Sequence, residues 1–301
     1  MCGKIVATGK NASSKWTDGQ RVVSTFNQSH VAGQIKAKDM SSGLGLPLDG
    51  VLAEYRVFPV EGLVAVPDYL SDNEAACLPI AAVTAWMSIN WMQPMGKPIT
   101  SPETTVLLQG TGGVSISGLQ IAKACGLQGT FSSLVYKDTD SLTYLVIVTS
   151  SSDEKLEKAR KLGADYTVNY KTNPDWEQKV MELTSGEGVD IILENGGAET
   201  LEKSFGCITF GGLISCVGYL SGREDLPGKR PNINVLTLMK NVTVKGIYNG
   251  PRDRFEEMLE LYAQKQIHPV IDKVFDFDQG KEALQYISSG AHFGKVVIKV
   301  A

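Results

Sequence analysis

The stretch "TVLLQGTGGVSISGLQIAKAC", residues 105–125, joins three patterns in a fixed order. A short apolar and β-branched run comes first, glycines follow, and apolar residues then recur at helical spacing. Gly110 permits a tight turn, and Gly112 lets a ligand approach the backbone closely. The amides that open the following helix, at Gly113 and Val114, point at any anion held there. The stretch therefore predicts a strand, a turn and a helix around an anion-binding cradle.

The spacing departs from GxGxxG, because Ser115 stands where the third glycine normally lets the helix pack closely on the strand. A serine adds only a hydroxymethyl group, so we expect a slight displacement of the helix. On its own, GxGxxS also fits a simple tight turn. Its position at the head of an alternating pattern of strands and helices favours a pyrophosphate site.

The chain from Thr104 onward alternates β-branched runs with helical segments, as in a parallel sheet covered by helices on both faces. This order predicts a doubly wound parallel Rossmann sheet of the α/β class. The expected strands are 105–109, 145–149, 166–170, 189–194, 212–218 and 242–247, and the expected helices are 115–125, 152–162, 174–184, 198–205 and 252–266.

The N-terminal part has a different pattern, with strand-like runs at 3–9, 18–25 and 50–59 between Gly, Asp and Pro turns. It predicts a second, mostly β domain, to which the strand that ends the tail is expected to return. The expected domains are a β domain at 1–85, a Rossmann domain at 86–266 that carries an insertion at 127–145, and a return to the β domain at 267–301.

Composition argues against several classes of function. A formal net charge of −4 without a basic block argues against a nucleic-acid surface. The five cysteines are scattered, with no CxxC pair and no His at metal spacing, which favours reduced, mostly buried thiols over disulfides or zinc. The sequence shows neither an apolar signal core nor the roughly 20 apolar residues of a membrane span. We therefore expect a cytoplasmic protein that contacts no membrane.

The end of the second Rossmann strand predicts the choice of dinucleotide. In NAD-binding proteins an acidic residue there holds the ribose 2′-hydroxyl and would repel a 2′-phosphate. Here Ser150, Ser151 and Ser152 stand in its place, with Lys155 one turn into the helix. Hydroxyls and an ammonium group favour the phosphate, hence NADP(H) over NAD(H). The same residues also fit a helix N-cap with a capping box, at Ser152 or Asp153, and both interpretations can hold together.

The chain resembles the medium-chain dehydrogenase/reductase superfamily, specifically its zinc-independent, quinone-oxidoreductase-like alcohol dehydrogenases with their enoyl-reductase-type domain. Six motifs carry the resemblance in the same order along nearly the whole chain: "DGVLAEYRVFP", "LSDNEAACLPIAAVTAW", "QGTGGVSISGLQIAKA", "KLGADYTVNY", "ENGGAETLEKS" and "HFGKVVI". It implies a GroES-like β domain, here partial, beside the Rossmann domain, with the nicotinamide in the cleft between them. It also implies a homodimer, sometimes a tetramer, joined through the Rossmann edge.

The resemblance further implies which residues bind the cofactor. It places Gly110, Gly112, Gly113 and Val114 at the pyrophosphate, and Ser150, Ser151, Lys155 and Tyr170 at the adenosine phosphate. Thr84, Asn195, Val217, Gly218 and the stretch after Lys245 would line the nicotinamide side, and Lys295 would close over the cofactor. A catalytic zinc is not expected, because Ile80 stands where zinc-dependent relatives have a ligand, and the structural four-cysteine lobe is absent.

No catalytic residue is assigned from the sequence. Tyr55, Thr84, Trp86 and Asn249 are pocket candidates, although Tyr55 and Trp86 fit core or hinge packing better. The three histidines, His30, His268 and His292, have no visible carboxylate partner, and His292 reads as a loop residue before the final strand.

Two segments depart from the family pattern. Relatives carry further residues before the stretch that matches "CGKIVATGK", so the chain is either a genuine short form or begins at a misassigned start codon. The segment 127–145 exceeds the usual connection of about 2 to 6 residues, and fits either a β-hairpin or a retained intron translated in frame.

The function expected is NADP(H)-dependent hydride transfer to or from a small quinone, enone, aldehyde, ketone or alcohol. Two alternatives stay open. One is a non-catalytic NADP(H)-binding protein or an inactive truncated homologue, and the other is a detached enoyl-reductase domain of a polyketide-type synthase.

Overall fold

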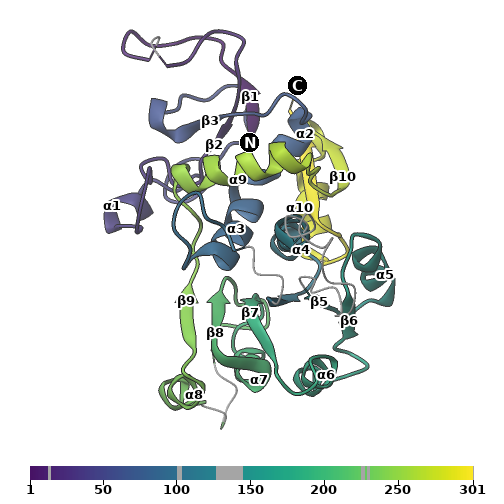
Figure 1. Cartoon of the computed structure of the whole chain (residues 1–301). Coiled ribbons are helices and arrows are strands. Elements are labelled where there is room, and N and C mark those ends of the chain that lie inside the picture. The colour runs from purple at the N-terminus through teal and green to yellow at the C-terminus, as the bar shows by residue number, and fades with distance from the viewer. Residues whose placement is uncertain (13–14, 100–103, 127–144, 225–227, 229–230, 301) are drawn as a thin grey trace, which may run out of the picture. The chain divides into compact units, whose positions relative to one another are not determined.

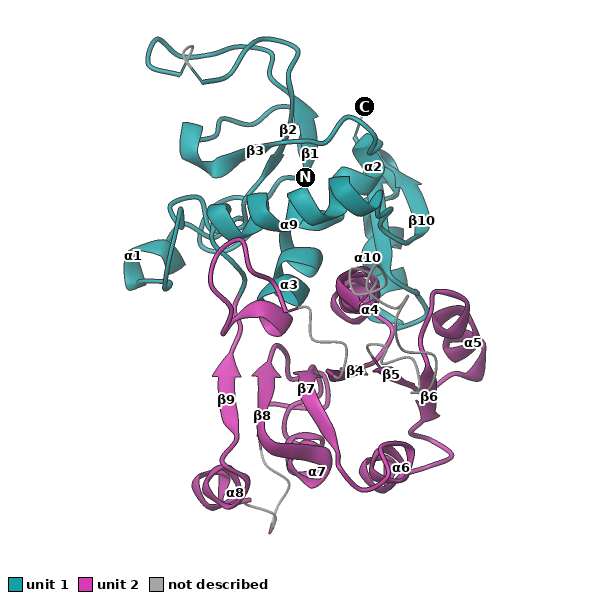
Figure 2. Ribbon diagram, viewed as in Figure 1, with its two compact units in different colours: residues 1–87, 249–301 teal, residues 88–248 magenta. Residues whose placement is uncertain are grey.

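The computed structural model describes residues 1–12, 15–99, 104–126, 145–224, 228 and 231–300. Its contacts divide the chain into two compact units (Figure 2). Unit 1 comprises residues 1–87 and 249–301, and unit 2 comprises residues 88–248. The predicted insertion at 127–145 lies outside the described residues, apart from Leu145. In the described part of the chain, no helix is both long enough and apolar enough to cross a membrane.

Unit 2 is built on a parallel sheet, in which six strands of the described chain run in the order β6-β5-β4-β7-β8-β9 (Figure 1). The strands are β4 (Thr105–Gln109), β5 (Leu145–Ser150), β6 (Tyr166–Asn169), β7 (Val189–Glu194), β8 (Ile208–Cys216) and β9 (Thr243–Gly246). Strand β4 comes first in the sequence and lies inside the sheet, with later strands added on both sides of it. The predicted doubly wound Rossmann sheet is thereby confirmed.

Helices cover both faces of this sheet. On one face α6 (Trp176–Leu183), α7 (Leu201–Cys207) and α8 (Ile233–Lys240) pack into one apolar cluster with strand residues such as Leu107 and Ile192. Helices α4 (Gly113–Gly126) and α5 (Asp153–Lys161) lie outside that cluster and contact β4, β5 and β6. Because strand side chains alternate between faces, α4 and α5 cover the opposite one.

Unit 1 holds two small sheets within the described residues. β1 (Cys2–Lys4), β2 (Arg21–Ser24) and β3 (Leu63–Ala65) are antiparallel, whereas β10 (Ile271–Asp276) and β11 (Lys295–Lys299) pair in parallel. Residues 267–301 lie in unit 1, where β10 and β11 form a sheet separate from the antiparallel one. The helical elements are α1 (Ala37–Met40), η1 (Val60–Gly62), α2 (Asp72–Ala75), η2 (Leu78–Ala82), α3 (Val83–Asn90, which ends in unit 2), α9 (Arg252–Lys265), η4 (Phe277–Gln279) and α10 (Gly280–Ser288).

The strand predicted at 50–59 is wrong, because the third strand of the antiparallel sheet is β3. Residues 51–59 form no strand. Tyr55 and Val57 are 77% and 94% exposed, whereas Phe58 packs, partly buried, against a small core cluster, so the apolar residues of this stretch share no buried face. Apolar alternation predicts a strand only where one face can be buried.

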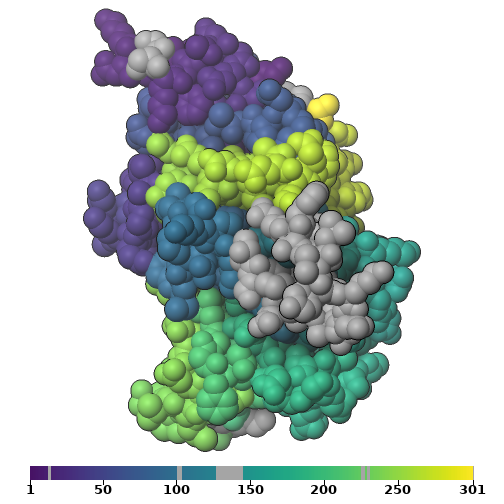
Figure 3. Space-filling model, viewed as in Figure 1, coloured from purple at the N-terminus to yellow at the C-terminus, as the bar shows by residue number. Residues whose placement is uncertain are grey.

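Helix α9 belongs to unit 1, whereas the sequence placed residues 252–266 in the Rossmann domain. Its first amides, at Arg252 and Asp253, donate to the carbonyls of His30 and Val31 at 3.0 and 3.1 Å. Farther along, Glu257 accepts a hydrogen bond from the Trp86 indole at 3.0 Å. Figure 3 shows α9 as a light-green ridge on the surface of unit 1.

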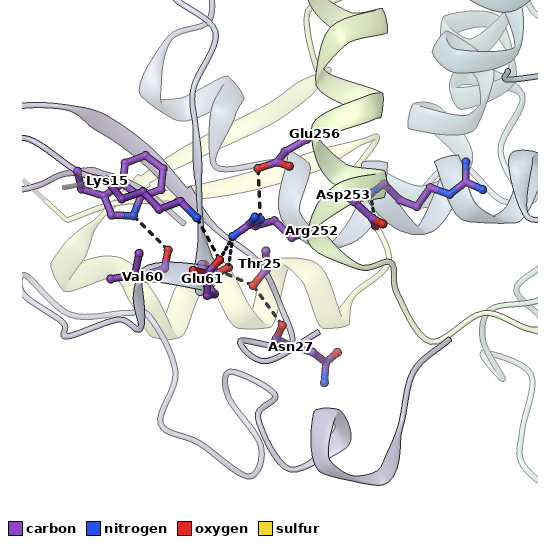
Figure 4. A network of polar contacts seen from close by, with 11 residues as sticks. Lys15, Thr25, Asn27, Val60, Glu61, Arg252, Asp253 and Glu256 are labelled. Atoms are coloured by element: carbon purple, nitrogen blue, oxygen red, sulfur yellow. Dashed lines mark hydrogen bonds and ion pairs between the residues drawn. The ribbon is translucent and has the colours of Figure 1, made fainter. Parts of the chain in front are cut away.

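A carboxylate on η1 ties three distant segments of unit 1 together. Glu61 forms an ion pair with Lys15 at 3.0 Å and a second one with Arg252 at the start of α9 (Figure 4). Arg252 in turn contacts Glu256 at 3.3 Å. The hydrogen bonds from Lys15 and then from Arg252 lower the pKa of Glu61 below its usual value.

Replacing Glu61 by Gln should reduce stability near neutral pH and have less effect in acid. A lowered pKa in the folded state stabilises the fold above the unfolded pKa of about 4.3, and this contribution disappears as the pH falls through the folded value. Because Glu61 is 53% exposed, solvent screening limits the loss to about 1 kcal/mol or less.

Urea unfolding of the wild type and Glu61→Gln at pH 7 and pH 3 measures this effect. Glu260→Gln, on the exposed side of α9, is the matched control, since Glu260 makes no ion pair among the described residues. A stability difference between the wild type and Glu61→Gln that is the same at both pH values would contradict the assignment.

Candidate functional site

A buried polar network joins the carboxyl ends of β4 and β7 in unit 2. Gln109, the last residue of β4, donates to Glu194 Oε2 at 2.7 Å and to Ser204 Oγ at 2.9 Å. Its side-chain oxygen accepts from the amides of Asn195 and Gly196 at 3.0 and 3.2 Å. One glutamine side chain therefore fixes the end of β4 to the turn that follows β7.

Glu194, the last residue of β7, is the centre of this network and is 1% exposed. Its Oε1 accepts from the amides of Gly196 and Gly197 at 2.9 and 3.0 Å and from the Thr200 hydroxyl. Its Oε2 accepts from the Ser204 hydroxyl and from Gln109. A buried carboxylate is tolerated when such donors satisfy its oxygens, so the β7–α7 turn is folded around this side chain.

Glu194 and its partners are not among the site residues predicted from the sequence. The available signal was a charged residue that ends the otherwise buried run "VDIILE". Because a charge at the end of a buried strand needs local partners, the Gly, Thr and Ser residues after it were candidates for donors.

Ser115 belongs to the same network, which corrects its interpretation as a small packing change. Its hydroxyl donates to the Gln109 carbonyl at 2.7 Å and accepts from Asn195 Nδ2 at 3.1 Å. Asn195 Nδ2 also donates to that carbonyl at 2.9 Å. The serine that replaces the third glycine thus connects α4 to β4 and to the turn after β7.

The glycine turn has the predicted strand, turn and helix order. Gly110 has φ +81°, in the region that favours glycine, and its amide donates to Thr149 Oγ1 at 3.3 Å. A Cβ built on Gly110 would meet no heavy atom of the described residues within 4 Å, so this position is open in the described part of the chain. Helix α4 begins at Gly113, where the first amides of a helix lack intrahelical acceptors. An open turn of this kind fits a pyrophosphate.

The turn after β8 packs tightly against the turn after β7. The amides of Val217 and Gly218 both donate to the Glu194 carbonyl, at 2.9 and 3.2 Å. A Cβ on Gly218 would come within 2.9 Å of the Asn195 carbonyl oxygen, so this approach requires glycine. The structure therefore brings Asn195, Val217 and Gly218, which were assigned to the nicotinamide side, into one cluster of turns.

The residues assigned to the adenosine phosphate meet at the ends of β5 and β6. Ser150 is buried, and its hydroxyl accepts from the Ser152 amide at 3.4 Å. Tyr170 is 42% exposed, and its amide donates to the Ser150 carbonyl at 3.0 Å. Ser151 and Lys155 are half-buried. Ser151 and Tyr170 therefore offer more accessible groups here than Ser150 does.

The N-cap predicted for α5 is confirmed at Ser152. Its hydroxyl accepts from the Lys155 amide at 3.4 Å. The predicted capping box does not form, because the third helical residue is Lys155, which has no acceptor to return the bond.

The candidate site residues of unit 1 lie in separate elements. Thr84 is buried in α3, and Lys295 begins β11 with its amide donating to the Val270 carbonyl at 2.9 Å. Asn249 is buried and donates to the Pro79 carbonyl at 3.2 Å. Trp86 is fully buried, as expected of a core residue. For Tyr55 the expectation of core packing is wrong, because its side chain is 77% exposed.

One of the three histidines has a carboxylate partner that the sequence did not reveal. His268 Nδ1 lies 2.7 Å from Glu74 Oε1, so the expectation of no such partner is wrong for this residue. His30 Nε2 lies 2.9 Å from the Gly33 carbonyl. His292 lies in the loop before β11, as expected.

The cysteines are free thiols, as predicted, and three of them are buried. Burial raises the pKa of Cys207 to about 12 and that of Cys77 to about 11. A thiol with so high a pKa is a poor nucleophile and a poor metal ligand at neutral pH. Across the residues that the structure describes, no three His, Cys, Asp or Glu side chains gather as metal ligands would, and the half-exposed Ile80 supplies no donor atom.

Comparison with known proteins agrees with this architecture. The family models "Alcohol dehydrogenase GroES-like domain" and "Zinc-binding dehydrogenase" match residues 1–68 and 142–264. A zinc-type alcohol dehydrogenase-like protein of Schizosaccharomyces pombe is 40% identical over 282 residues, which are 94% of this chain and 75% of that protein.

Two solved structures have the same fold over 100% of this chain. A putative alcohol dehydrogenase from Sinorhizobium meliloti, 80% of which is covered, has a TM-score of 0.84 at 36% identity. A structure described as an NAD-dependent alcohol dehydrogenase, 81% of which is covered, has a TM-score of 0.79 at 29% identity.

The six-stranded parallel sheet of the described chain, with an open glycine turn at the end of its first strand, defines unit 2 as a Rossmann domain. The chain belongs to the medium-chain dehydrogenase/reductase superfamily and is an oxidoreductase of the alcohol dehydrogenase-like type.

Ser115→Ala should lower the stability of the protein by about 1 to 3 kcal/mol, because it leaves buried hydrogen-bonding groups of the network without a partner. Were Ser115 only a packing compromise, the smaller alanine, which also favours a helix, would be neutral or stabilising. Chemical denaturation of the variant measures the difference. Ser117→Ala, a second buried serine in α4, is the control, and an equal effect of both changes would contradict the assignment.

Proposed function

We propose that this protein is an NADP(H)-dependent, zinc-independent oxidoreductase that transfers a hydride between its cofactor and a small quinone, enone, aldehyde, ketone or alcohol. The observation that carries the proposal is the glycine turn at Gly110, whose Cβ position is open among the described residues and which the buried Glu194 network holds in place through Gln109. Family membership supports the reaction class, and the turn supports a dinucleotide as cofactor.

The residues of unit 2 fit a dinucleotide. The open space at Gly110 leaves room for a pyrophosphate, and the amides that open α4 would donate to it. The nicotinamide supplies or accepts the hydride when the cofactor is bound. The residues of this chain would orient the cofactor through the turns after β4, β7 and β8. Gln109 and Glu194 fix the positions of these turns relative to one another.

The preference for NADP(H) rests on the end of β5. No acidic residue ends this strand, and Ser151, Ser152 and Tyr170 follow directly after the ends of β5 and β6, so their hydroxyls are candidate donors to a 2′-phosphate. One solved neighbour is described as NAD-dependent, so the preference proposed for this chain is argued from its own residues.

The proposed zinc independence rests on the donor chemistry. Matching relatives carry "zinc" in their descriptions, yet Ile80 occupies the position in "LPIAAVTAW" where the family pattern puts a ligand. An aliphatic side chain cannot coordinate a metal. The described residues therefore do not fit a catalytic zinc, and no step is assigned to one.

Titration of the protein with NADPH and NADH tests the cofactor. We expect NADPH to bind at least about tenfold more tightly, since an extra charged phosphate contact is worth about 1.4 kcal/mol or more. Tighter binding of NADH would overturn the preference. NADPH binding without turnover on quinones, enones, aldehydes and alcohols would favour a non-catalytic NADP(H)-binding protein.

Gly110→Ala should abolish most cofactor binding, because alanine strains a backbone at φ +81° and points a methyl group into the open space. Gly186→Ala is a close control. Gly186 has φ +88° and, among the described residues, an equally open Cβ position. It precedes β7, however, and so lies at the amino ends of the parallel strands, whereas Gly110 lies at their carboxyl ends. Equal loss of NADPH affinity in both variants would show that strain alone is responsible.

Removal of metal should leave the activity unchanged. After treatment with a strong chelator we expect the same rate of hydride transfer, and elemental analysis of the untreated protein should find well below one zinc per chain. Activity that is lost on chelation and restored by zinc would contradict zinc independence.

A further inference from the structure

An asparagine at the end of β6 binds the first acidic residue that follows β5 in the sequence. Asp153, the first residue of α5, is the first acidic side chain after β5 and is exposed. Asn169 Nδ2 donates to Asp153 Oδ1 at 2.8 Å. Asn169 pairs with Ser150 in the sheet register, so this contact spans the ends of β5 and β6.

The orientation of the Asn169 side chain is fixed at both ends. Its Oδ1 accepts from the Lys171 amide at 3.0 Å, so Nδ2 is the atom that must face Asp153. Its backbone carbonyl accepts from the Asn173 amide at 2.9 Å and from Asn173 Nδ2 at 3.0 Å. Asn169 is 9% exposed. It is therefore a rigid donor that keeps one carboxylate oxygen on the β6 side.

We propose that Asn169 is a specificity-determining residue, which favours NADP(H) by holding the Asp153 carboxylate away from the 2′-phosphate. The inference rests on the proposed NADP(H) preference and deepens it. An acid at the end of this strand is what selects a ribose 2′-hydroxyl and repels a 2′-phosphate. Asp153 lies within one turn of that position, and a released Asp153 would supply such an acid.

Two consequences distinguish this role from a purely structural one. Loss of the Asn169 donor should weaken binding of 2′-phosphorylated ligands selectively and leave ligands with a free 2′-hydroxyl unaffected or bound more tightly. The loss should also depend on the charge of Asp153, since it arises from repulsion and not from a damaged turn.

The experiment compares NADPH with NADH, and 2′,5′-ADP with 5′-AMP, by fluorescence titration and calorimetry of the full chain. In Asn169→Ala the preference for the 2′-phosphorylated ligands should fall at least about fivefold, because the released carboxylate can approach the phosphate and the repulsion between like charges grows as their separation shrinks. Asp153→Asn alone should change the preference by less than about twofold, and should restore it when combined with Asn169→Ala.

Asn173→Ala is the matched control, because Asn173 contacts the same loop and donates to Asn169 without contacting Asp153 in the described structure. Its cofactor preference should equal that of the wild type. If Asn169→Ala does not fold, Asn169→Ser, whose hydroxyl is too short to reach Asp153, takes its place.

The outcomes separate this inference from the proposed function. A wild type that does not prefer the 2′-phosphorylated ligands would overturn the proposed cofactor preference and this role together. A wild-type preference that survives in Asn169→Ala, or whose loss is not restored by Asp153→Asn, would overturn the role of Asn169 alone.

Discussion

The site in unit 2 depends on one buried carboxylate. Glu194 ends β7 at 1% exposure and takes all its observed hydrogen bonds from neutral donors. A buried charge that loses a donor costs far more than an exposed one. The turns that supply those donors are therefore held to a single conformation. Because the Gln109 side chain bonds both to Glu194 and to the turn after β7, that constraint extends to the glycine turn that follows β4.

Ser115 shows how the network alters the glycine pattern. A third glycine would serve close packing of α4 against β4, but it would leave the Gln109 carbonyl and Asn195 with one partner fewer. The serine hydroxyl satisfies both groups at 2.7 and 3.1 Å. The slightly larger residue therefore contributes hydrogen bonds that a glycine cannot make, and the departure from GxGxxG is an alternative way to fix the same turn.

The strands and most helices of unit 2 could be predicted from the sequence, because parallel strands buried on both faces are continuous apolar runs. Helix α8 was missed, since none of its residues is fully buried and Leu238 and Met239 are 78% and 68% exposed. Only a partly buried pair, Ile233 and Leu236, packs against the core cluster, which is too little to produce a clear helical period. The polar network around Glu194 could not be predicted from the sequence, for a different reason. Gln109 and Glu194 are 85 positions apart, and only the strand order β4-β7 brings their side chains together. In the same way, nothing near Asp153 in the sequence indicates that Asn169 is its partner.

Different kinds of interaction act at the two ends of the proposed cofactor site. At the turns after β4, β7 and β8, buried hydrogen bonds fix backbone amides whose dipoles are independent of pH and weakly screened by salt. At the ends of β5 and β6, the residues are more exposed, and recognition depends on the placement of charges such as Asp153 and Lys155. If the proposed site is correct, changes in the first region should alter whether any dinucleotide binds, whereas changes in the second should alter which one binds. In the described part of the chain, the side-chain hydrogen bonds of Gln109, Ser115, Glu194 and Asn195 all lie between residues 109 and 204, within unit 2. Substitutions in unit 1 should therefore leave the side-chain bonds that hold the glycine turn intact.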